Sequence, residues 1–173
     1  MRKQNGFSLI ELLIVVTIIL IIAAIAIPNL LRARMAANDS SAAASVRQIT
    51  TAEITYFNTY PGFGFPATMA PLGGAPPCVT TPVTSCLIDN NLALNGTPAG
   101  SGKSGYTFAA TSSAGAGSAI NNQFYVTGTP LGALTGTRAY CSYEDAVIRI
   151  QPAGVITTVP SYAACQALAA MNN

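Results

Sequence analysis

The sequence predicts an α+β protein in which one long N-terminal α-helix packs, at its C-terminal half, against an antiparallel β-sheet head. Three observations lead to this fold class. An apolar run at Leu12–Ile27 continues into an amphipathic helical pattern, turn-forming residues follow that pattern after Tyr60, and patterns typical of strands gather toward the C-terminus. We therefore expect a short leader (residues 1–6), a helix (residues 7–60) and a head (residues 61–173).

The apolar segment is long enough to cross a membrane. Leu12–Ile27 is interrupted only by Thr17, and residues 7–31 contain a single charged side chain, Glu11. These 25 residues would measure about 37 Å as a helix with a rise of 1.5 Å per residue. Because the hydrocarbon core of a bilayer is about 30 Å thick, we expect residues 7–31 to form a transmembrane half of the helix.

The second half of the helix, residues 32–60, is amphipathic. Polar side chains such as Arg47, Gln48 and Glu53 are expected on the faces away from its apolar stripe. Such a helix needs cover on one stripe only, which predicts a sheet packed against it. Pro61-Gly62 ends the pattern, since proline cannot continue a helix. The apolar stripe consists of Val46, Ile49, Ala52, Tyr56 and Tyr60.

The head combines turn-rich loops with short strands. Residues 151–154 (Gln-Pro-Ala-Gly) are typical of a hairpin turn, so an antiparallel meander is the simplest topology. Alternation places Ile148 and Ile150 on the side that meets the helix. The aromatic residues near the end of the helix, from Tyr56 to Phe65, are expected at the seam between helix and head. The predicted strands are residues 106–110, 123–127, 137–143, 146–150 and 155–159.

Composition excludes several classes of function. The 173 residues are 50% hydrophobic and 8% charged, with a net charge of +2 and no His, whereas an average soluble domain is about 25% charged. So few cations cannot neutralise a run of phosphates, and no direct nucleic-acid site is expected. Without His, the commonest general base and metal ligand is missing. We expect no enzyme, no cofactor and no metal site.

The four cysteines fit an oxidising compartment. Cys78, Cys86, Cys141 and Cys165 all lie in the expected head, and none forms a C-x-x-C pair. Four cysteines allow three connectivities. We favour Cys78 with Cys86 across a short loop, and Cys141 with Cys165 joining the C-terminal segment to the rest of the head.

The sequence around the start of the apolar segment, Gly6-Phe7-Ser8-Leu9-Ile10-Glu11, resembles the class III signal of type IV pilins and related pseudopilins. The resemblance implies that a prepilin peptidase cuts between Gly6 and Phe7 and methylates the new amino group of Phe7. Loss of the leader would remove Arg2 and Lys3, which leaves residues 7–173 formally neutral. The resemblance to type IV pilins further implies that Glu11 pairs with the amino terminus of a neighbouring subunit during filament assembly.

Pro28 also matches a position of this family, where the helix loosens in the filament. Independently of the resemblance, proline removes one backbone donor and crowds the preceding turn, so we expect a kink or local melting at Pro28. The whole layout then resembles the pilin lollipop, with residues 7–31 as the transmembrane and assembly half.

Two other interpretations of the N-terminus remain. A conventional secretory signal would be cut after Ala24-Ile25-Ala26, and a plain membrane anchor would not be cut at all. Glu11 argues against both, because a carboxylate in an apolar segment is costly and usually has a partner. N-terminal sequencing would distinguish the three possibilities.

The expected function is that of a major pilin, a structural subunit that self-associates into a helical homopolymer. Its expected partners are further copies of itself, prepilin peptidase, inner-membrane assembly machinery and, before assembly, membrane lipid. We expect a single-pass protein of the bacterial inner membrane with its head outside the cytoplasm, and later an extracellular pilus filament. The alternatives are a type II secretion pseudopilin, a minor pilin or an anchored periplasmic binding module; adhesion, motility, DNA uptake and electron transfer stay undecided.

Overall fold

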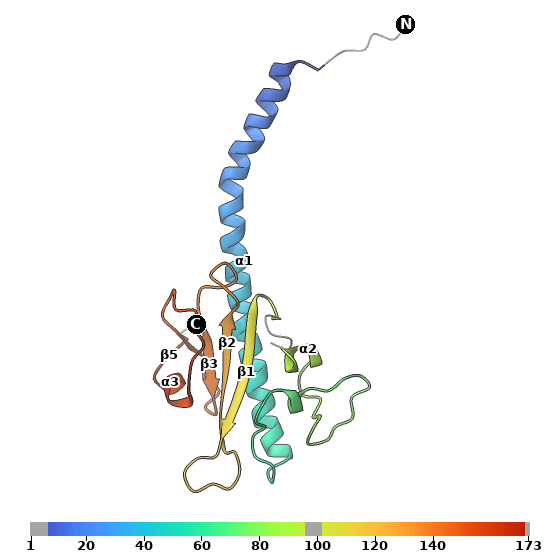
Figure 1. Ribbon diagram of the computed structural model, residues 1–173, viewed down its shortest axis with the longest axis vertical. Helices are drawn as coiled ribbons and strands as arrows, with labels where there is room; N and C mark the ends of the chain where they lie inside the picture. Colours follow the sequence, from blue (N-terminus) through green and yellow to red (C-terminus); the bar gives the residue numbers. More distant parts are fainter. Residues whose placement is uncertain (1–6, 96–101, 172–173) are drawn as a thin grey trace. The chain divides into compact units, whose positions relative to one another are not determined.

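The structure is a computed structural model that describes residues 7–95 and 102–171 (Figure 1). Helix α1 (Leu9–Thr59) is 51 residues long, and a five-stranded antiparallel sheet follows it in the chain. These two elements confirm the predicted α+β class. The chain forms two compact units, Met1–Arg34 and Met35–Asn173, and α1 contributes residues to both.

The sheet has the strand order β1-β2-β3-β4-β5, and every neighbouring pair is antiparallel. β1 and β2 are paired over their full length, from Tyr106 opposite Pro130 to Ser113 opposite Gln123. The later strands are short, so β1 and β2 form the main platform of the sheet. The strands are β1 (Tyr106–Ser113), β2 (Gln123–Pro130), β3 (Tyr140–Tyr143), β4 (Arg149–Ile150) and β5 (Ala169–Ala170).

The prediction of a strand at residues 155–159 was wrong. A turn does form at Pro152, where Val155 N donates to the Pro152 carbonyl at 3.0 Å, but the chain then leaves the sheet. Instead, β4 pairs with β5 from the C-terminal tail, and Met171 N donates to the Ile148 carbonyl at 2.8 Å. The physical reason is competition for one edge: the tail reaches β4, while Val159 is buried beside Cys141 and Cys165.

Three short helices lie in the loops around the sheet. Helix α3 begins after Ser161, whose side chain accepts a hydrogen bond from Ala164 N at 3.2 Å and so caps the helix. Helix α2 and the 3₁₀ helix η1 supply Leu92 and Leu72, both fully buried, to the core. The bounds are η1 (Ala70–Leu72), α2 (Asn90–Ala93) and α3 (Tyr162–Gln166).

The core lies between the C-terminal part of α1 and one face of the sheet. Val46 and Ile49 of α1 are fully buried against Phe108 and Val126 in one cluster, which also includes Ile148. Gly128 of β2 allows this close approach, because a Cβ there would lie 3.0 Å from Val46 Cγ2. The sheet therefore covers α1, as the amphipathic pattern predicted.

Glu53 was expected on an exposed face of α1, and this prediction was wrong. Its side chain is fully buried, together with the neighbouring positions Ser45 and Thr50. The buried side of α1 is wider than one apolar stripe because the sheet, the loop residue Phe65 and Leu92 of α2 together cover it.

Two disulfides close segments of the head. Cys78 joins Cys86 across 8 positions, and Cys141 joins Cys165 across 24 positions. Cys141 and Cys165 are both fully buried. The second disulfide therefore ties α3 to β3 inside the head.

Candidate functional site

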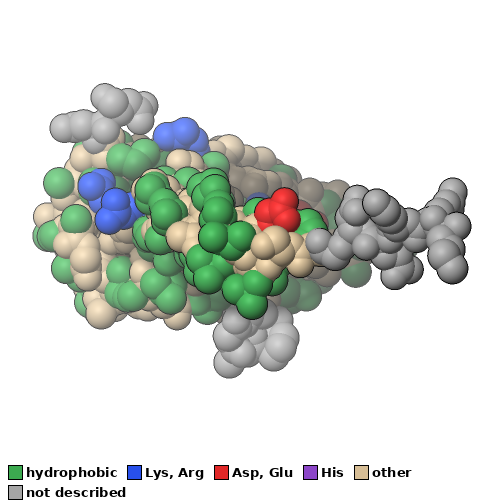
Figure 2. All heavy atoms as spheres, turned by 90° about the horizontal axis from the view of Figure 1, so that it is seen from above, with side chains coloured by type: hydrophobic (Ala, Val, Ile, Leu, Met, Phe, Trp, Pro, Cys, Tyr) green, Lys and Arg blue, Asp and Glu red, His purple; other side chains and the backbone are tan. Residues whose placement is uncertain are grey.

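The N-terminal part of α1 is a continuous apolar surface. The large hydrophobic side chains from Phe7 to Leu31 are all exposed, including Phe7 at 74% and Ile10 at 64%. This part of the helix has a mean hydropathy of 3.2 over its most apolar stretch and is long enough to cross a membrane. In the view of Figure 2, large areas are hydrophobic and only a few charged side chains are visible. Lipid or other apolar helices must cover such a surface.

The apolar run tolerates its one polar interruption because that group is satisfied within the helix. Thr17 Oγ1 donates to the Leu13 carbonyl one turn earlier, at 2.7 Å. Its hydroxyl therefore needs no partner from the surroundings.

Glu11 lies in the first turn of α1 and turns back toward the start of the helix. Its Oε2 accepts a hydrogen bond from Ser8 N at 3.3 Å, while the Ser8 carbonyl accepts from Leu12 N at 3.2 Å. Ser8 and Glu11 thus have the spacing and one of the two bonds of a capping box. A carboxylate here is also favoured by the positive end of the helix dipole. The side chain is directed toward the N-terminal end of the helix.

Pro28 does not interrupt α1, so the local melting expected there is absent from this structure. Proline removes only one backbone donor, leaving the Ala24 carbonyl without its helical partner. Because helix formation is cooperative, the turns on both sides maintain the helix through this position. Gly6, the other residue of the expected cleavage site, lies outside the described residues.

A polar anchor that the sequence did not reveal holds α1 to the sheet. Asp39 accepts hydrogen bonds from the Tyr106 hydroxyl, from Thr137 N at 3.1 Å and from Thr137 Oγ1 at 2.5 Å. The preceding residue, Asn38, donates from its Nδ2 to the Thr135 carbonyl at 2.8 Å. Burial and the bond to Asp39 raise the pKa of Tyr106 well above its usual range. Adjacent Asn and Asp within an Ala-rich helix were the only sequence signal.

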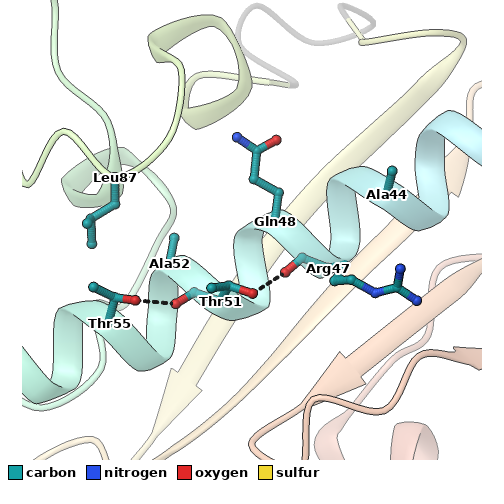
Figure 3. Close-up of a pocket in the computed structure, with 7 residues that line it drawn as sticks. All are labelled: Ala44, Arg47, Gln48, Thr51, Ala52, Thr55 and Leu87. Carbon is teal, nitrogen blue, oxygen red and sulfur yellow. Dashed lines mark hydrogen bonds between the residues drawn. The ribbon is translucent and has the colours of Figure 1, made fainter.

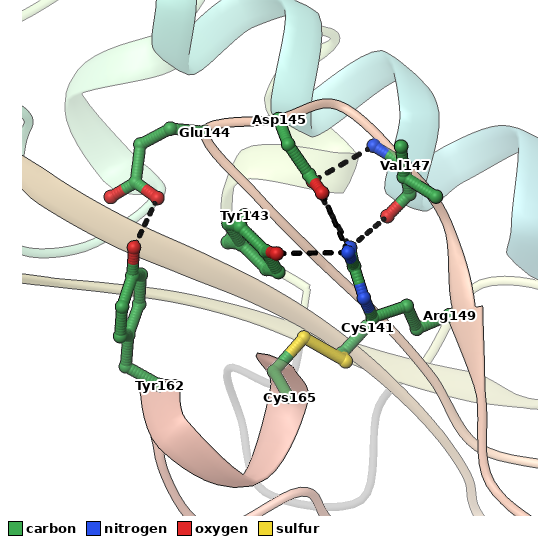
Figure 4. A network of polar contacts seen from close by, with 8 residues as sticks. All are labelled: Cys141, Tyr143, Glu144, Asp145, Val147, Arg149, Tyr162 and Cys165. Atoms are coloured by element: carbon green, nitrogen blue, oxygen red, sulfur yellow. Dashed lines mark hydrogen bonds and ion pairs between the residues drawn. A yellow bond between two sulfur atoms is a disulfide. The ribbon is translucent and has the colours of Figure 1, made fainter. Parts of the chain in front are cut away.

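A second polar network surrounds the Cys141–Cys165 disulfide (Figure 4). Arg149 donates to both carboxylate oxygens of Asp145, at 2.6 and 3.0 Å, and to the Tyr143 hydroxyl at 2.8 Å. Its guanidinium also lies 4.2 Å from the centre of the Tyr143 ring. Partial burial alone would raise the pKa of Asp145, but hydrogen bonds from Arg149 and from Val147 N outweigh it and lower that pKa.

The neighbouring carboxylate holds a different segment. Glu144 Oε1 accepts from Phe124 N at 2.6 Å, and its Oε2 accepts from the Tyr162 hydroxyl at 2.8 Å. Glu144 and Asp145 therefore do not act on a common point, as a general acid and base would need to do. Their geometry is that of structural ties.

A shallow groove of about 370 Å³ follows the exposed side of α1 (Figure 3). Its hydroxyl groups are already used within the helix: Thr51 donates to the Arg47 carbonyl at 2.9 Å and Thr55 to the Thr51 carbonyl at 2.8 Å. No nucleophile lies beside a base in this groove, and the described residues contain no group of three metal-ligating side chains.

The comparisons with known proteins agree with the N-terminal geometry. Residues 1–27 match the family described as the prokaryotic N-terminal methylation motif, which defines the class of N-terminus that the chain carries. The chain is 65% identical over 40 residues to the "Type IV wide pilus major component PilA4" of Thermus thermophilus, and 43% identical over 56 residues to the "Type IV major pilin protein PilA" of Myxococcus xanthus. The motif and the two relatives support a type IV pilin.

This likeness is confined to part of each chain. The matches span 23% and 32% of this chain, and 30% and 26% of the two relatives. No solved structure matches the chain. The head therefore has to be understood from its own residues.

Proposed function

We propose that this chain is a structural subunit, a major pilin, of a type IV pilus. The observation that carries the proposal is the methylation motif at residues 1–27, with Glu11 turned toward the N-terminal end of a helix whose first half exposes apolar side chains on every face. Both named relatives are major pilus components, which supports the same role here. In this proposal the chain is a building unit and not an enzyme.

The N-terminus is processed before assembly. Prepilin peptidase cuts between Gly6 and Phe7, removing the leader with Arg2 and Lys3, and the new amino group of Phe7 is methylated. The cut places a cationic amine four residues ahead of Glu11. Residues 7–31 then rest in the bacterial inner membrane, with residues 61–173 outside the cytoplasm as the head.

Assembly moves the apolar helix from lipid into a bundle of identical helices. Lipid tails are as apolar as Leu, so burial of apolar surface gives little driving force and close packing with polar pairing must supply it. Glu11 supplies the polar pair by meeting the amine of a neighbour, because a carboxylate within an apolar bundle needs a partner. Local loosening at Pro28 adjusts the helix on assembly, and residues 32–60 stay packed on the head.

Repetition of this contact builds the filament. A head-to-tail contact that does not close on itself generates an open helical polymer. The chain's own residues supply the contact, whereas the force and the order of addition come from inner-membrane assembly machinery. The product is an extracellular pilus.

Two variants separate processing from assembly. Glu11→Gln keeps the size of the side chain and an acceptor for Ser8 N but removes the charge, so we expect processed protein in the membrane and few or no filaments. Gly6→Val crowds the scission site, so we expect unprocessed protein. Asp89→Asn, which removes an exposed carboxylate of the head, is the control and should assemble normally.

The readouts are N-terminal sequencing and electron microscopy of material shed from cells. Normal filaments from Glu11→Gln would refute the role of this charge. Wild-type protein that remains in the membrane without filaments would refute a major pilin and favour a minor pilin or a pseudopilin.

A further inference from the structure

Glu53 of α1 is a buried carboxyl without a partner. Its side chain has 0% exposure, and neither Oε1 nor Oε2 has a hydrogen-bond partner among the described residues. The same is true of Ser142 Oγ on β3. Ser142 lies opposite Val126, a residue of the cluster that α1 covers, so Ser142 belongs to the side of the sheet that faces α1. The core between α1 and the sheet thus contains two unsatisfied polar groups.

The charged and titratable groups of α1 do not offer Glu53 a counter-charge. Arg47 is exposed on the groove side of the helix. Asp39 is bound to Tyr106 and lies fourteen residues earlier, about 21 Å along the helix axis. The Tyr56 hydroxyl donates to the Pro82 carbonyl at 2.6 Å, and the Tyr60 ring packs 5.1 Å from the Tyr56 ring.

The groups of the sheet are likewise engaged elsewhere. Arg149 is held by Asp145 and Tyr143, and Glu144 is held by Phe124 N and Tyr162. Among the described residues, Arg138 and Lys103 beside the sheet are exposed, and the buried titratable groups of the sheet on the α1 side are the phenols of Tyr106 and Tyr140. Tyr106 is bound to Asp39, and burial raises the pKa of Tyr140 to about 12. In the loop that covers α1, Asp89 is exposed.

An ionised carboxylate in this position would be buried without a cation or a donor, which is far more costly than a neutral carboxyl group. We propose that Glu53 is protonated in the folded head and that its ionisation loosens α1 from the sheet, so that the helix–sheet interface is a switch opened by alkaline pH. The inference concerns residues 35–173 and does not depend on the proposed function.

The direction of the pH dependence follows from proton uptake on folding. Burial raises the pKa of Glu53 from 4.5 to about 8. Between pH 4.5 and about pH 8, the folded chain therefore holds a proton on Glu53 that the unfolded chain has already released. The stability that this proton contributes is complete below pH 4.5 and is lost as the pH rises from there through about 8. Within this range the unfolding constant rises by up to about tenfold per pH unit. The lowered pKa of Asp145 acts only in the acidic range, and the raised pKa values of Tyr106 and Tyr140 lie above this range.

The test is equilibrium unfolding of the full chain in detergent micelles between pH 5 and pH 8, followed by tyrosine near-ultraviolet circular dichroism. We expect the unfolding constant of the wild type to rise about 400-fold across these three pH units, because the slope is shallower near each of the two pKa values. Glu53→Gln and Glu53→Met, which cannot ionise, should be flat over the same range. Glu144→Gln is the matched control, because Glu144 is a carboxylate that already accepts hydrogen bonds from two donors. This variant should keep the wild-type slope.

A direct titration keeps the proposal falsifiable if both Glu53 variants fail to fold. The carboxyl ¹³C resonance of Glu53 in the wild-type chain should titrate above pH 7. Titration near 4.5, or a Glu53→Gln variant with the wild-type slope, would overturn the proposal.

Discussion

Removal of the Cys141–Cys165 disulfide should destabilise the head more than removal of the Cys78–Cys86 disulfide. Each pair is replaced by alanine in the full chain, so that no new polar group is buried. Both variants shorten two side chains in the same way, but they release loops of different length, 24 and 8 positions.

Loop closure gives the magnitude. When the disulfide is removed, the chain-entropy relation predicts that the free energy of unfolding falls by about 3.4 kcal/mol for the longer loop and by about 2.5 kcal/mol for the shorter one. Burial adds to this difference, because Cys141 and Cys165 are fully buried beside Val159 whereas Cys78 is exposed. Loss of the buried sulfur atoms leaves space that the neighbours fill only in part. The expected gap between the two variants is therefore at least about 1 kcal/mol.

The assay is denaturant unfolding of the full chain in detergent micelles, with the free energy of unfolding compared between wild type and the two double variants. Wild type in the presence of a reductant serves as a third arm and should approach the sum of both losses. Equal losses, or a larger loss for Cys78→Ala/Cys86→Ala, would refute the reasoning from loop length and burial.

Two further substitutions test the packing of the head. Gly136→Ala should cost about 1–3 kcal/mol, because the new Cβ would lie 2.1 Å from the Tyr106 hydroxyl oxygen, which Asp39 and the Arg138 carbonyl hold in place. Gly132→Ala has no atom within 4 Å of its Cβ and is the control; thermal unfolding midpoints that are equal for both variants would contradict this account. Arg149→Lys should cost about 1 kcal/mol, because lysine keeps the charge but cannot bind both Asp145 oxygens and stack on an aromatic ring at once. Chemical denaturation checks this value, and a lysine variant as stable as the wild type would show that charge alone suffices.

Local patterns were enough to predict several parts of the molecule. The long apolar helix follows from composition over consecutive residues, and its end at Thr59 is explained by Pro61-Gly62 two residues later. The first two strands follow from β-branched and aromatic residues between turn formers, and the structure extends both beyond the predicted segments. Ile148 lies in the cluster against α1, as its alternation predicted.

Contacts between distant residues could not be predicted in this way. Asp39 and Thr137 are 98 positions apart, and nothing near either residue indicates the other. The strand at the edge of the sheet also depends on a contact between distant residues. Ala169–Ala170 has no strand pattern of its own and becomes a strand only because it pairs with Arg149–Ile150. Residues 155–159 have the better local pattern but lose the competition for that edge.

The sequence by itself determined the N-terminal part of the chain: an apolar helix, one carboxylate in its first turn, and two cations among the first six residues. Each of these is a property of neighbouring residues, which periodicity and composition record directly. The tertiary structure alone decided that Glu53 is buried, because burial depends on what covers a helix face and not on the helix itself. The sheet, the loop residue Phe65 and Leu92 of α2 cover more of α1 than one apolar stripe. Glu53 is therefore buried in the core, where its carboxyl oxygens have no hydrogen-bond partner among the described residues.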